Sequence, residues 1–385
     1  MQNTEELREE RRQLFEDLYC MRVPKRVPIS IRANKEYVIQ YANMSLQDLT
    51  WYPHKEKIEA AADIFCNDHF ADKMPFNMGP TFPSFEAFLD SKNMIVSETG
   101  YIQHPEVIIM QDTEYDDLIE NPVDFIIDTI MPRKFPAIDT VPGMSALSFA
   151  ASISRAVQDS AYGAAVHKRL IEKYGYFTPA AKSTTFSPFD FIADYFRGIT
   201  GIFMDIRRYP EKVIAACEAL VDLTVTFGRT DSPTPMSECY MPLHMPPFMK
   251  EKDFKKFWWP CFKKAADGIS KDGHGLSLFC ESDWTRYLDY LQELPRGTRI
   301  RFEFGDPQLV KDKIGSDAVI SGFYPCSDFV SKTEKECIDE AKRLTDILAP
   351  GGGYTFDTDK ILSTYDGGAE NYFAVLNYVY ENARY

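Results

Sequence analysis

The most regular stretch of the sequence begins at His274-Gly-Leu-Ser-Leu-Phe-Cys280, a short apolar run that is typical of a buried strand. Helical patterns and further apolar runs alternate from there to the end of the chain, and one such pair precedes it. The patterns predict strands over 237–244, 274–280, 299–304, 318–322 and 351–356, and helices over 251–271, 284–294, 306–314, 333–348 and 367–382. This alternation, with short connections, predicts parallel strands joined by helical crossovers.

Two architectures accommodate such an alternation, an open doubly wound sheet and a closed barrel. Neither GxGxxG nor GxxxxGK[ST] follows an early strand, and Gly351-Gly-Gly353 is a lone glycine cluster, so the open sheet is disfavoured. We therefore predict an α/β fold, a (β/α)8 TIM barrel with an elaborated N-terminal region, in a single domain over residues 1–385. The N-terminal region is expected to hold an extension over about 1–25, a strand at 27–32 and helices over 4–20, 54–70 and 143–174.

Composition limits the class of protein. The 385 residues are 44% hydrophobic and 26% charged, which excludes a disordered or collagen-like chain. The net charge of −15 repels a phosphate backbone, so we expect no nucleic-acid partner. No apolar run approaches the ~20 residues that cross a bilayer, and the charged start of the chain is not typical of a signal peptide. We therefore expect a cytoplasmic protein with no membrane partner, whose eight cysteines, with no CxxC pair, form no disulfide framework.

Side chains that bind metals or move protons follow the ends of the predicted strands, which meet around one active site in a barrel. They are Glu238, Cys239, His244, Cys280, Glu281, Asp283, Glu303, Asp306, Cys326, Asp328, Asp357 and Asp359. Thiol, imidazole and carboxylate groups suit zinc, which keeps one position open for substrate in catalytic sites. His244 is also explained as a hydrogen-bonded core histidine, and Cys280 and Cys326 as inert buried thiols. Glu281 and Asp283 are also typical of a helix start, where acids complement the helix dipole.

A second candidate stretch is Ser187-Pro-Phe-Asp-Phe-Ile-Ala-Asp-Tyr-Phe-Arg-Gly198. Asp190 and Asp194 are four residues apart, on one face of a helix, and Arg197 lies three residues further on. This set is suited to orienting a polar substrate or to acid–base chemistry, and equally to a salt bridge on a helix surface. The aromatic run over 257–262 is most simply core packing.

A series of motifs runs through the second half of the chain: Phe189-Asp-Phe-Ile-Ala-Asp-Tyr-Phe-Arg-Gly198, Asp205-Ile-Arg-Arg-Tyr-Pro-Glu-Lys-Val213, Met241-Pro-Leu-His244, Phe254-Lys-Lys-Phe-Trp-Trp-Pro260, Glu281-Ser-Asp-Trp284 and Ile320-Ser-Gly-Phe-Tyr-Pro325. In this order they resemble the uroporphyrinogen decarboxylase superfamily. The resemblance implies a (β/α)8 barrel with one of two activities. One is decarboxylation of uroporphyrinogen without a cofactor, and the other is methyl transfer to or from a corrinoid with zinc.

The chain departs from both branches of that superfamily. The arginine-rich segment of the decarboxylases corresponds to Ser30-Ile-Arg-Ala-Asn-Lys-Glu-Tyr37, which keeps Arg32 and Lys35 but lacks the arginine pair and the glycine. With a net charge of −15, true uroporphyrinogen decarboxylation is disfavoured. The His-x-Cys zinc motif of the methyltransferases reads Leu278-Phe-Cys280, and their later cysteine falls near Thr358-Asp-Lys360. Either a rebuilt zinc site or a metal-free pocket is consistent with these changes.

From this resemblance we expect a methyltransferase that passes a methyl group from a small methylated substrate, such as an aryl methyl ether, to a corrinoid (cobalamin) on a partner protein. The chain itself has no Asp-x-His-x-x-Gly corrinoid motif. The expected catalytic residues are Glu281, Asp283 and Asp190, the substrate-binding residues Asp194, Arg197, Arg32 and Tyr324, and the zinc ligands His244, Cys280, Glu281 and Cys326, with Asp359 as an alternative to Cys326. The rival hypotheses are a metal-independent lyase acting on a small carboxylic acid and a non-catalytic binding barrel. A homo-oligomer is left open.

Overall fold

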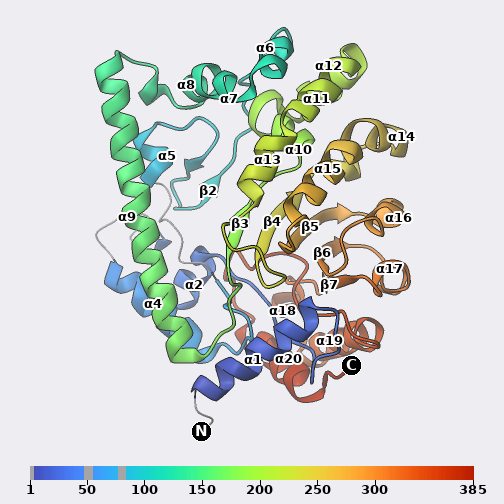
Figure 1. The fold of residues 1–385 in the computed structure, drawn as a ribbon. Coiled ribbons are helices and arrows are strands. Elements are labelled where there is room, and N and C mark those ends of the chain that lie inside the picture. Colours follow the sequence, from blue (N-terminus) through green and yellow to red (C-terminus); the bar gives the residue numbers. More distant parts are fainter. Residues whose placement is uncertain (1–3, 47–54, 77–83) are drawn as a thin grey trace.

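The computed structural model describes residues 4–46, 55–76 and 84–385 and has a mixed α/β architecture (Figure 1). Its main sheet has five parallel strands, which neighbour one another in chain order. They are β3 (Lys182–Thr184), β4 (Glu238–Leu243), β5 (Leu276–Asp283), β6 (Thr298–Phe304) and β7 (Ala318–Gly322). The predicted alternation of strands and helices is therefore confirmed from β4 to β7, and strand 318–322 has the predicted bounds.

The two faces of this sheet differ in chemistry because successive side chains point to opposite sides. On β6, Ile300 and Phe302 belong to the apolar core, whereas Arg299 and Arg301 line a small cavity on the other face. We call the face that carries these arginines the inner face. The neighbouring strands follow the same division, with Ser277 of β5 and Val319 of β7 on either side of Arg299.

Parallel backbone contacts continue beyond the five strands. β7 is bridged to the segment at 354–358, and that segment is bridged to residues 29–33. The carbonyl oxygen of Ile29 accepts the backbone N–H groups of residues 72 and 73, and Lys73 pairs with Phe177, which precedes β3. The strands predicted at 27–32 and 351–356 are thus present only as isolated bridges. The bridged pairs are Ile320–Tyr354, Tyr324–Thr358, Ile29–Phe356, Ala33–Leu362 and Lys73–Phe177, and the backbone N–H of Val27 also donates to the carbonyl oxygen of Ala383.

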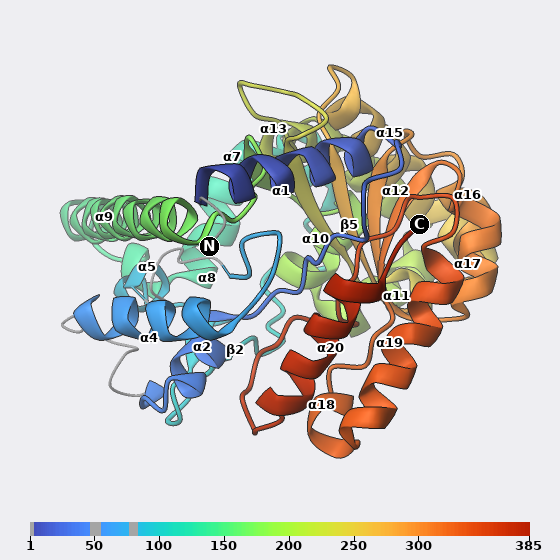
Figure 2. The ribbon, with the colours of Figure 1, turned by 90° about the horizontal axis from the view of Figure 1, so that it is seen from below.

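Helices that follow the strands cover the face of the sheet opposite the inner face, which we call the outer face (Figures 1 and 2). They are α10 (Pro188–Ile192), η4 (Ala193–Arg197), α11 (Gly198–Arg208), α12 (Pro210–Ala219), α13 (Val221–Gly228), η5 (Pro246–Phe248), α14 (Glu251–Asp253), η6 (Phe254–Trp258), α15 (Trp259–Ser270), η7 (Thr285–Tyr287), α16 (Leu288–Leu291), α17 (Pro307–Ile314), α18 (Asp328–Ser331), α19 (Glu334–Leu348) and α20 (Ala369–Asn382). The helix predicted over 251–271 is interrupted by the π-helical turn η6, since Pro260 has no backbone N–H to donate four residues back. Phe257, Trp258 and Trp259 are buried, as expected of core packing.

The N-terminal region is largely helical, and most of it lies to one side of the sheet, whereas its first helix lies below the strands in the view of Figure 1. It contains α1 (Thr4–Tyr19), α2 (Lys35–Tyr41), α4 (Lys55–Asp68), α5 (Ser84–Phe88), the hairpin β1 (Ile95–Val96) and β2 (Ile102–Gln103), α6 (Tyr115–Glu120), α7 (Pro122–Phe125), η2 (Ile126–Ile130), α8 (Met131–Lys134), η3 (Pro136–Ile138) and α9 (Pro142–Tyr174). The predicted helices at 4–20, 54–70 and 143–174 correspond to α1, α4 and α9. None of the helices in the described ranges is long and apolar enough to cross a membrane.

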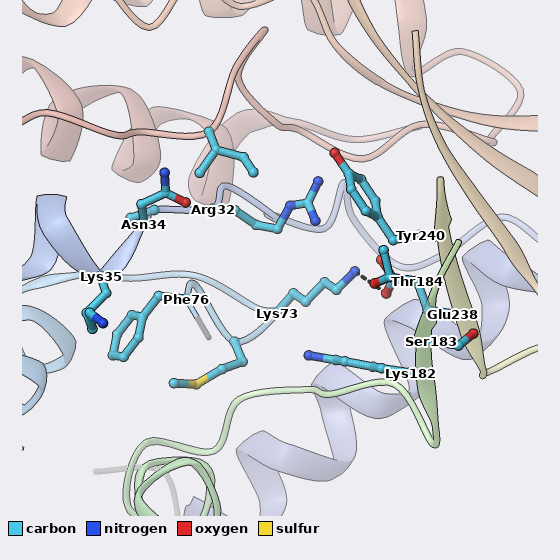
Figure 3. A pocket seen from close by; sticks show the side chains of 13 residues that line it. Arg32, Asn34, Lys35, Lys73, Phe76, Lys182, Ser183, Thr184, Glu238 and Tyr240 are labelled. Atoms are coloured by element: carbon cyan, nitrogen blue, oxygen red, sulfur yellow. Dashed lines mark hydrogen bonds and ion pairs between the residues drawn. The ribbon is translucent and has the colours of Figure 1, made fainter. Parts of the chain in front are cut away.

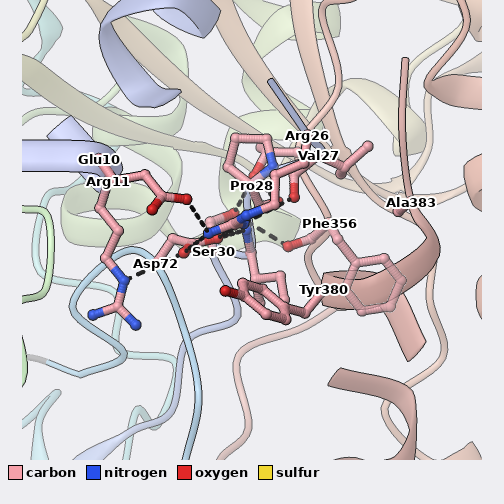
Figure 4. A network of polar contacts seen from close by, with 12 residues as sticks. Glu10, Arg11, Arg26, Val27, Pro28, Ser30, Asp72, Phe356, Tyr380 and Ala383 are labelled. Carbon is pink, nitrogen blue, oxygen red and sulfur yellow. Dashed lines mark hydrogen bonds and ion pairs between the residues drawn. The ribbon is translucent and has the colours of Figure 1, made fainter. Parts of the chain in front are cut away.

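A buried polar network fixes α1 against the rest of the chain (Figure 4). Asp72 is fully buried and accepts hydrogen bonds from both terminal nitrogens of Arg26, at 2.6 and 2.7 Å, from Nε of Arg11 at 3.3 Å and from the backbone N–H of Ile29 at 2.8 Å. The guanidinium of Arg26 also lies 4.6 Å from the ring centre of Tyr380 on α20. The network therefore joins α1, the first bridged segment and the last helix.

Candidate functional site

A pocket of about 490 Å³ opens on the inner side of the sheet, between β3, β4 and the segments after residues 31 and 72 (Figure 3). Four cationic side chains and one carboxylate line it, so we call it the cationic pocket. Its lining residues are Arg32, Ala33, Asn34, Lys35, Lys73, Met74, Phe76, Lys182, Ser183, Thr184, Glu238, Tyr240 and Ile361. In a chain of net charge −15, this excess of positive charge is a local feature that attracts anions.

The position of the pocket follows from strand alternation. Glu238 and Tyr240 are two residues apart on β4 and both point to the inner face, while Cys239 between them is buried in the core. Lys182 pairs in register with Glu238 across β3 and β4. Arg32 reaches the pocket from the opposite side and lies over the ring of Tyr240, with its guanidinium carbon 5.3 Å from the ring centre.

Electrostatics in the pocket favour a bound anion. Lys73 Nζ forms an ion pair with Glu238 Oε2 at 2.7 Å. Burial alone raises the pKa of Glu238, but the charges of Lys73, Arg299 and Arg32 lower it well below its ordinary value, so Glu238 stays ionised. Burial, together with the charge of Lys73, lowers the pKa of Lys182 to about 8. Within the lining of the pocket, Glu238 is thus one carboxylate among four cations, and the buried Asp357 in the adjoining small cavity is a further negative charge that acts on Arg32 and Lys73.

A second group of residues, the histidine cluster, consists of Asp194, His244 and Glu281. His244 follows the end of β4, and its Nδ1 lies 3.0 Å from Asp194 Oδ2 while its Nε2 lies 3.1 Å from Glu281 Oε1. Burial opposes a charged imidazole, but the two carboxylates outweigh it and raise the pKa of His244 to about 11. His244 is therefore an imidazolium at neutral pH, and Glu281, whose side chain is 36% exposed, is its solvent-facing partner.

Asp190 lies behind this cluster and is fully buried. Its carboxylate accepts hydrogen bonds from Trp258 Nε1 at 2.9 Å and from the backbone N–H of His244 at 3.2 Å. Burial and the nearby charge of Asp194 raise the pKa of Asp190 to about 7. Asp190 is therefore placed to hold the backbone of His244, and its catalytic role remains a prediction.

The arrangement does not suit a zinc ion bound by the four predicted ligands. His244 and Glu281 meet, but Cys280 points to the opposite face of β5 from Glu281 and is fully buried in the core, where burial raises the pKa of its thiol well above the ordinary value. Cys326 lies apart from the cluster and contacts Asp359, which accepts its backbone N–H at 3.0 Å. Within the described ranges, no three His, Cys, Asp or Glu side chains are arranged to hold a metal ion.

Three further predicted site residues have structural surroundings. Arg197 is buried and pairs with Asp205 at 2.6 Å, so it does not orient a substrate beside Asp194. Tyr324 is fully buried, and its hydroxyl donates to the carbonyl oxygen of Cys337. Asp283 is the exposed last residue of β5 and accepts the backbone N–H of Thr285, the first residue of η7, while Trp284 occupies the N-cap position. Arg32 is the one predicted substrate-binding residue that lines the cationic pocket.

Sequence patterns did not single out Lys73, Lys182 and Arg301 as site residues. The signal was present in Arg299-Ile-Arg-Phe-Glu303, where charged and apolar residues alternate strictly. In a parallel strand whose two faces are both covered, such alternation places charged side chains on the inner face. A buried charge there is costly unless an opposite charge or a hydrogen-bonding group compensates it. Lys73 carries no such pattern, since its segment is irregular.

Comparisons with known proteins bear on the fold. No family model and no curated protein matches the sequence. Among solved structures, a methyltransferase from Methanosarcina mazei is similar, with a TM-score of 0.58 and 13% sequence identity over 97% of this chain and 98% of that chain. At this identity the likeness shows a shared fold along nearly the whole length of both chains.

Proposed function

We propose that this protein is a methyltransferase that takes a methyl group from a small methylated substrate and passes it to a corrinoid carried by a partner protein. The observation that carries the proposal is the histidine cluster at the edge of a sheet whose whole fold is similar to that of a chain named as a methyltransferase. The motifs resembling the corrinoid-dependent branch of the uroporphyrinogen decarboxylase superfamily support the same reaction class.

We also propose that the chain closes into a (β/α)8 barrel. The five strands, together with the bridged segments around residues 29–33, 72–75 and 354–358, supply eight parallel extended segments in chain order. In such a barrel, residues after the strand ends face one mouth. His244 after β4 and Glu281 near the end of β5 would then share the mouth with Arg32.

The residues of the cluster are suited to stabilising a leaving oxygen. A reduced corrinoid supplies a nucleophile strong enough to accept a methyl group from an ether. The charged His244 holds a proton between Nε2 and the half-exposed Glu281. A substrate oxygen that takes the place of Glu281 at Nε2 would receive a hydrogen bond, and then the proton, as its bond to carbon breaks. Asp194 keeps the ring oriented from the other nitrogen. Because the donor set does not suit zinc, no step is assigned to a metal.

The test is formation of methylcobalamin from cob(I)alamin and a panel of aryl and alkyl methyl ethers, followed by absorbance under anaerobic conditions. We expect His244→Asn to lower the rate by at least ~100-fold. The exposed Lys264→Gln, on α15, serves as the control and should leave the rate unchanged. Failure of every donor, with correctly folded protein, would contradict the proposal.

The cationic pocket favours a second candidate, a lyase that decarboxylates a small acid without a metal. Its four cations suit a substrate carboxylate, and the imidazolium of His244 is a proton source for the carbanion left after CO2 departs. Carbon dioxide release that survives exhaustive chelation, needs no corrinoid and is lost in Asp190→Asn would favour this reaction over methyl transfer.

A further inference from the structure

Arg301 is a buried cation that lacks a polar partner. Its side chain lies on the inner face of β6, the residue is 3% exposed, and none of its three guanidinium nitrogens hydrogen-bonds to a described residue. The guanidinium carbon lies 3.9 Å from the centre of the ring of Phe279 on β5. A cation–π contact compensates only part of the cost of burying a charge. Asp357 lines the same cavity but does not hydrogen-bond to Arg301, so the guanidinium keeps its donors available for a bound anion.

The groups around Arg301 connect the two parts of the site. Burial lowers its pKa, as does the charge of Arg32 in the cationic pocket, while Asp357 and, more weakly, Glu281 in the histidine cluster raise it. Neither carboxylate lies within ion-pair distance of Arg301. The charge of Arg301 is thus influenced by groups of both the cationic pocket and the histidine cluster.

A small cavity of about 30 Å³ adjoins the guanidinium. Arg32, Lys73 and Glu238 line both this cavity and the cationic pocket, so the cavity extends the pocket inward. Its volume is that of roughly two water molecules, which suits the end of a ligand and is too small for a whole one. The planar fork of an arginine matches a carboxylate, which it binds through two parallel hydrogen bonds.

We propose that the substrate carries a carboxylate, that Arg301 and Arg32 bind this group in the inner cavity, and that the rest of the substrate occupies the cationic pocket. This inference rests on the proposed function, since it names the class of molecule that the same site accepts: a small methylated carboxylic acid. Lys182 at the pocket wall adds long-range attraction, and the carboxylate end fixes how far the reacting end lies from the histidine cluster.

The experiment measures binding without any methyl acceptor, by calorimetry and by thermal unfolding of the full chain. The probes are 4-methoxybenzoate, its neutral amide and inorganic phosphate. We expect the acid to bind and to raise the unfolding midpoint, and the amide and phosphate to bind at least about 10-fold more weakly. Equal binding of acid and amide, tighter binding of phosphate, or no binding of the acid overturns the proposal.

Two variants separate a binding role from a structural one. Arg301→Met removes an uncompensated charge at similar length, so it should weaken acid binding at least about 10-fold while leaving the midpoint of the ligand-free protein unchanged or higher. Arg301→Lys keeps the positive charge but not the planar guanidinium, so it should weaken acid binding less than Arg301→Met does. If Arg301→Met fails to fold, the comparison of Arg301→Lys with the wild type still tests the proposal. The exposed Arg296→Gln is the control for loss of one positive charge. Unchanged acid binding in Arg301→Lys and Arg301→Met overturns the proposal.

These outcomes are distinct from failure of methyl transfer. Acid binding through Arg301 without methylcobalamin formation rejects the proposed reaction and leaves the carboxylate site in place. Methyl transfer from neutral ethers, with no preference for the acid, rejects the carboxylate site and leaves the reaction in place.

Discussion

The change Glu238→Gln is expected to act in opposite directions on stability and on anion binding. Glu238 is the only carboxylate among the described residues that line the cationic pocket, and it pairs with Lys73 at 2.7 Å. Glutamine keeps the shape of the side chain and removes its charge. Lys73 then remains buried near Arg32, Arg299 and Lys182 without its ion-pair partner, and the more distant Asp357 still offers it a negative charge.

The expected loss of stability can be bounded from this geometry. Two unit charges 2.7 Å apart attract by about 6 kcal/mol at an effective dielectric constant of ~20. Part of this is offset because glutamine is easier to bury than a carboxylate, so the net loss is about 3–5 kcal/mol, as for other broken buried pairs. A carboxylate whose pKa is lowered in the folded protein stabilises the fold at pH values above its pKa in the unfolded chain. It loses that contribution as the pH falls toward its pKa in the folded protein. The difference between wild type and variant should therefore be full at pH 7 and shrink below about pH 4.

The same change should strengthen anion binding. One negative charge fewer, at roughly 6–8 Å from a bound carboxylate, favours it by about 1–2 kcal/mol after solvent screening, or about 5- to 30-fold in Kd. Urea unfolding gives the stability, and calorimetry with 4-methoxybenzoate gives the affinity. Glu218→Gln, which breaks a half-exposed pair with Lys264, is the matched control, with an expected loss below ~1 kcal/mol. Unchanged stability in Glu238→Gln, or weaker anion binding, would refute this account of the pocket.

Three further outcomes are expected. Arg11→Gln removes one of the two arginines that contact Asp72 and should lower the free energy of unfolding by about 2–4 kcal/mol. The control Arg12→Gln, at the adjacent exposed position, should change it by less than ~1 kcal/mol. Equal losses of the two variants in urea unfolding would contradict the buried network. His244 has a raised pKa, so its contribution to stability is full below about pH 6.5 and is lost as the pH rises toward 11. His244→Asn should reduce the fall in stability between pH 7 and 10 by about 1–2 kcal/mol, a small figure because the ring is partly exposed. Parallel curves of stability against pH for the wild type and the variant would disprove the pairing. Acid binding should weaken as the pH rises through about 8, where Lys182 loses its charge. Lys182→Met should remove that step from the calorimetric pH profile, and a step that persists in this variant would contradict the assignment.

Much of the secondary structure could be predicted because its signals are local. The strand at 318–322 and the helix over 333–348 correspond closely to β7 and α19, where apolar spacing and the capping box of Thr333 act within a few residues. The segments at 27–32 and 351–356 were less predictable, because their pairing depends on residues more than three hundred positions away in the chain.

The membership of the site was harder to predict because it depends on single-residue register. Cys280 and Glu281 are neighbours in sequence, yet only Glu281 reaches His244, and Ser282, with φ of 60°, marks a register shift just beyond them. Arg197 was expected beside Asp194, but Gly198, with φ of 70°, redirects the chain so that Asp205 becomes its partner. Such left-handed turns change which side chains meet without changing the periodicity that a sequence displays.

The contacts at Asp72 have a consequence for synthesis of the protein. Asp72 joins Arg11 and Arg26 near the start of the chain, Arg26 lies on Tyr380, and the segment at 27–30 bonds to Phe356 and Ala383. During translation Arg11 and Arg26 can meet Asp72 early, but the segment at 27–30 cannot bond to Phe356 and Ala383 until more than three hundred further residues have been synthesised. The cationic pocket, whose walls include both Arg32 and Ile361, therefore takes its final shape only after residue 361 has left the ribosome.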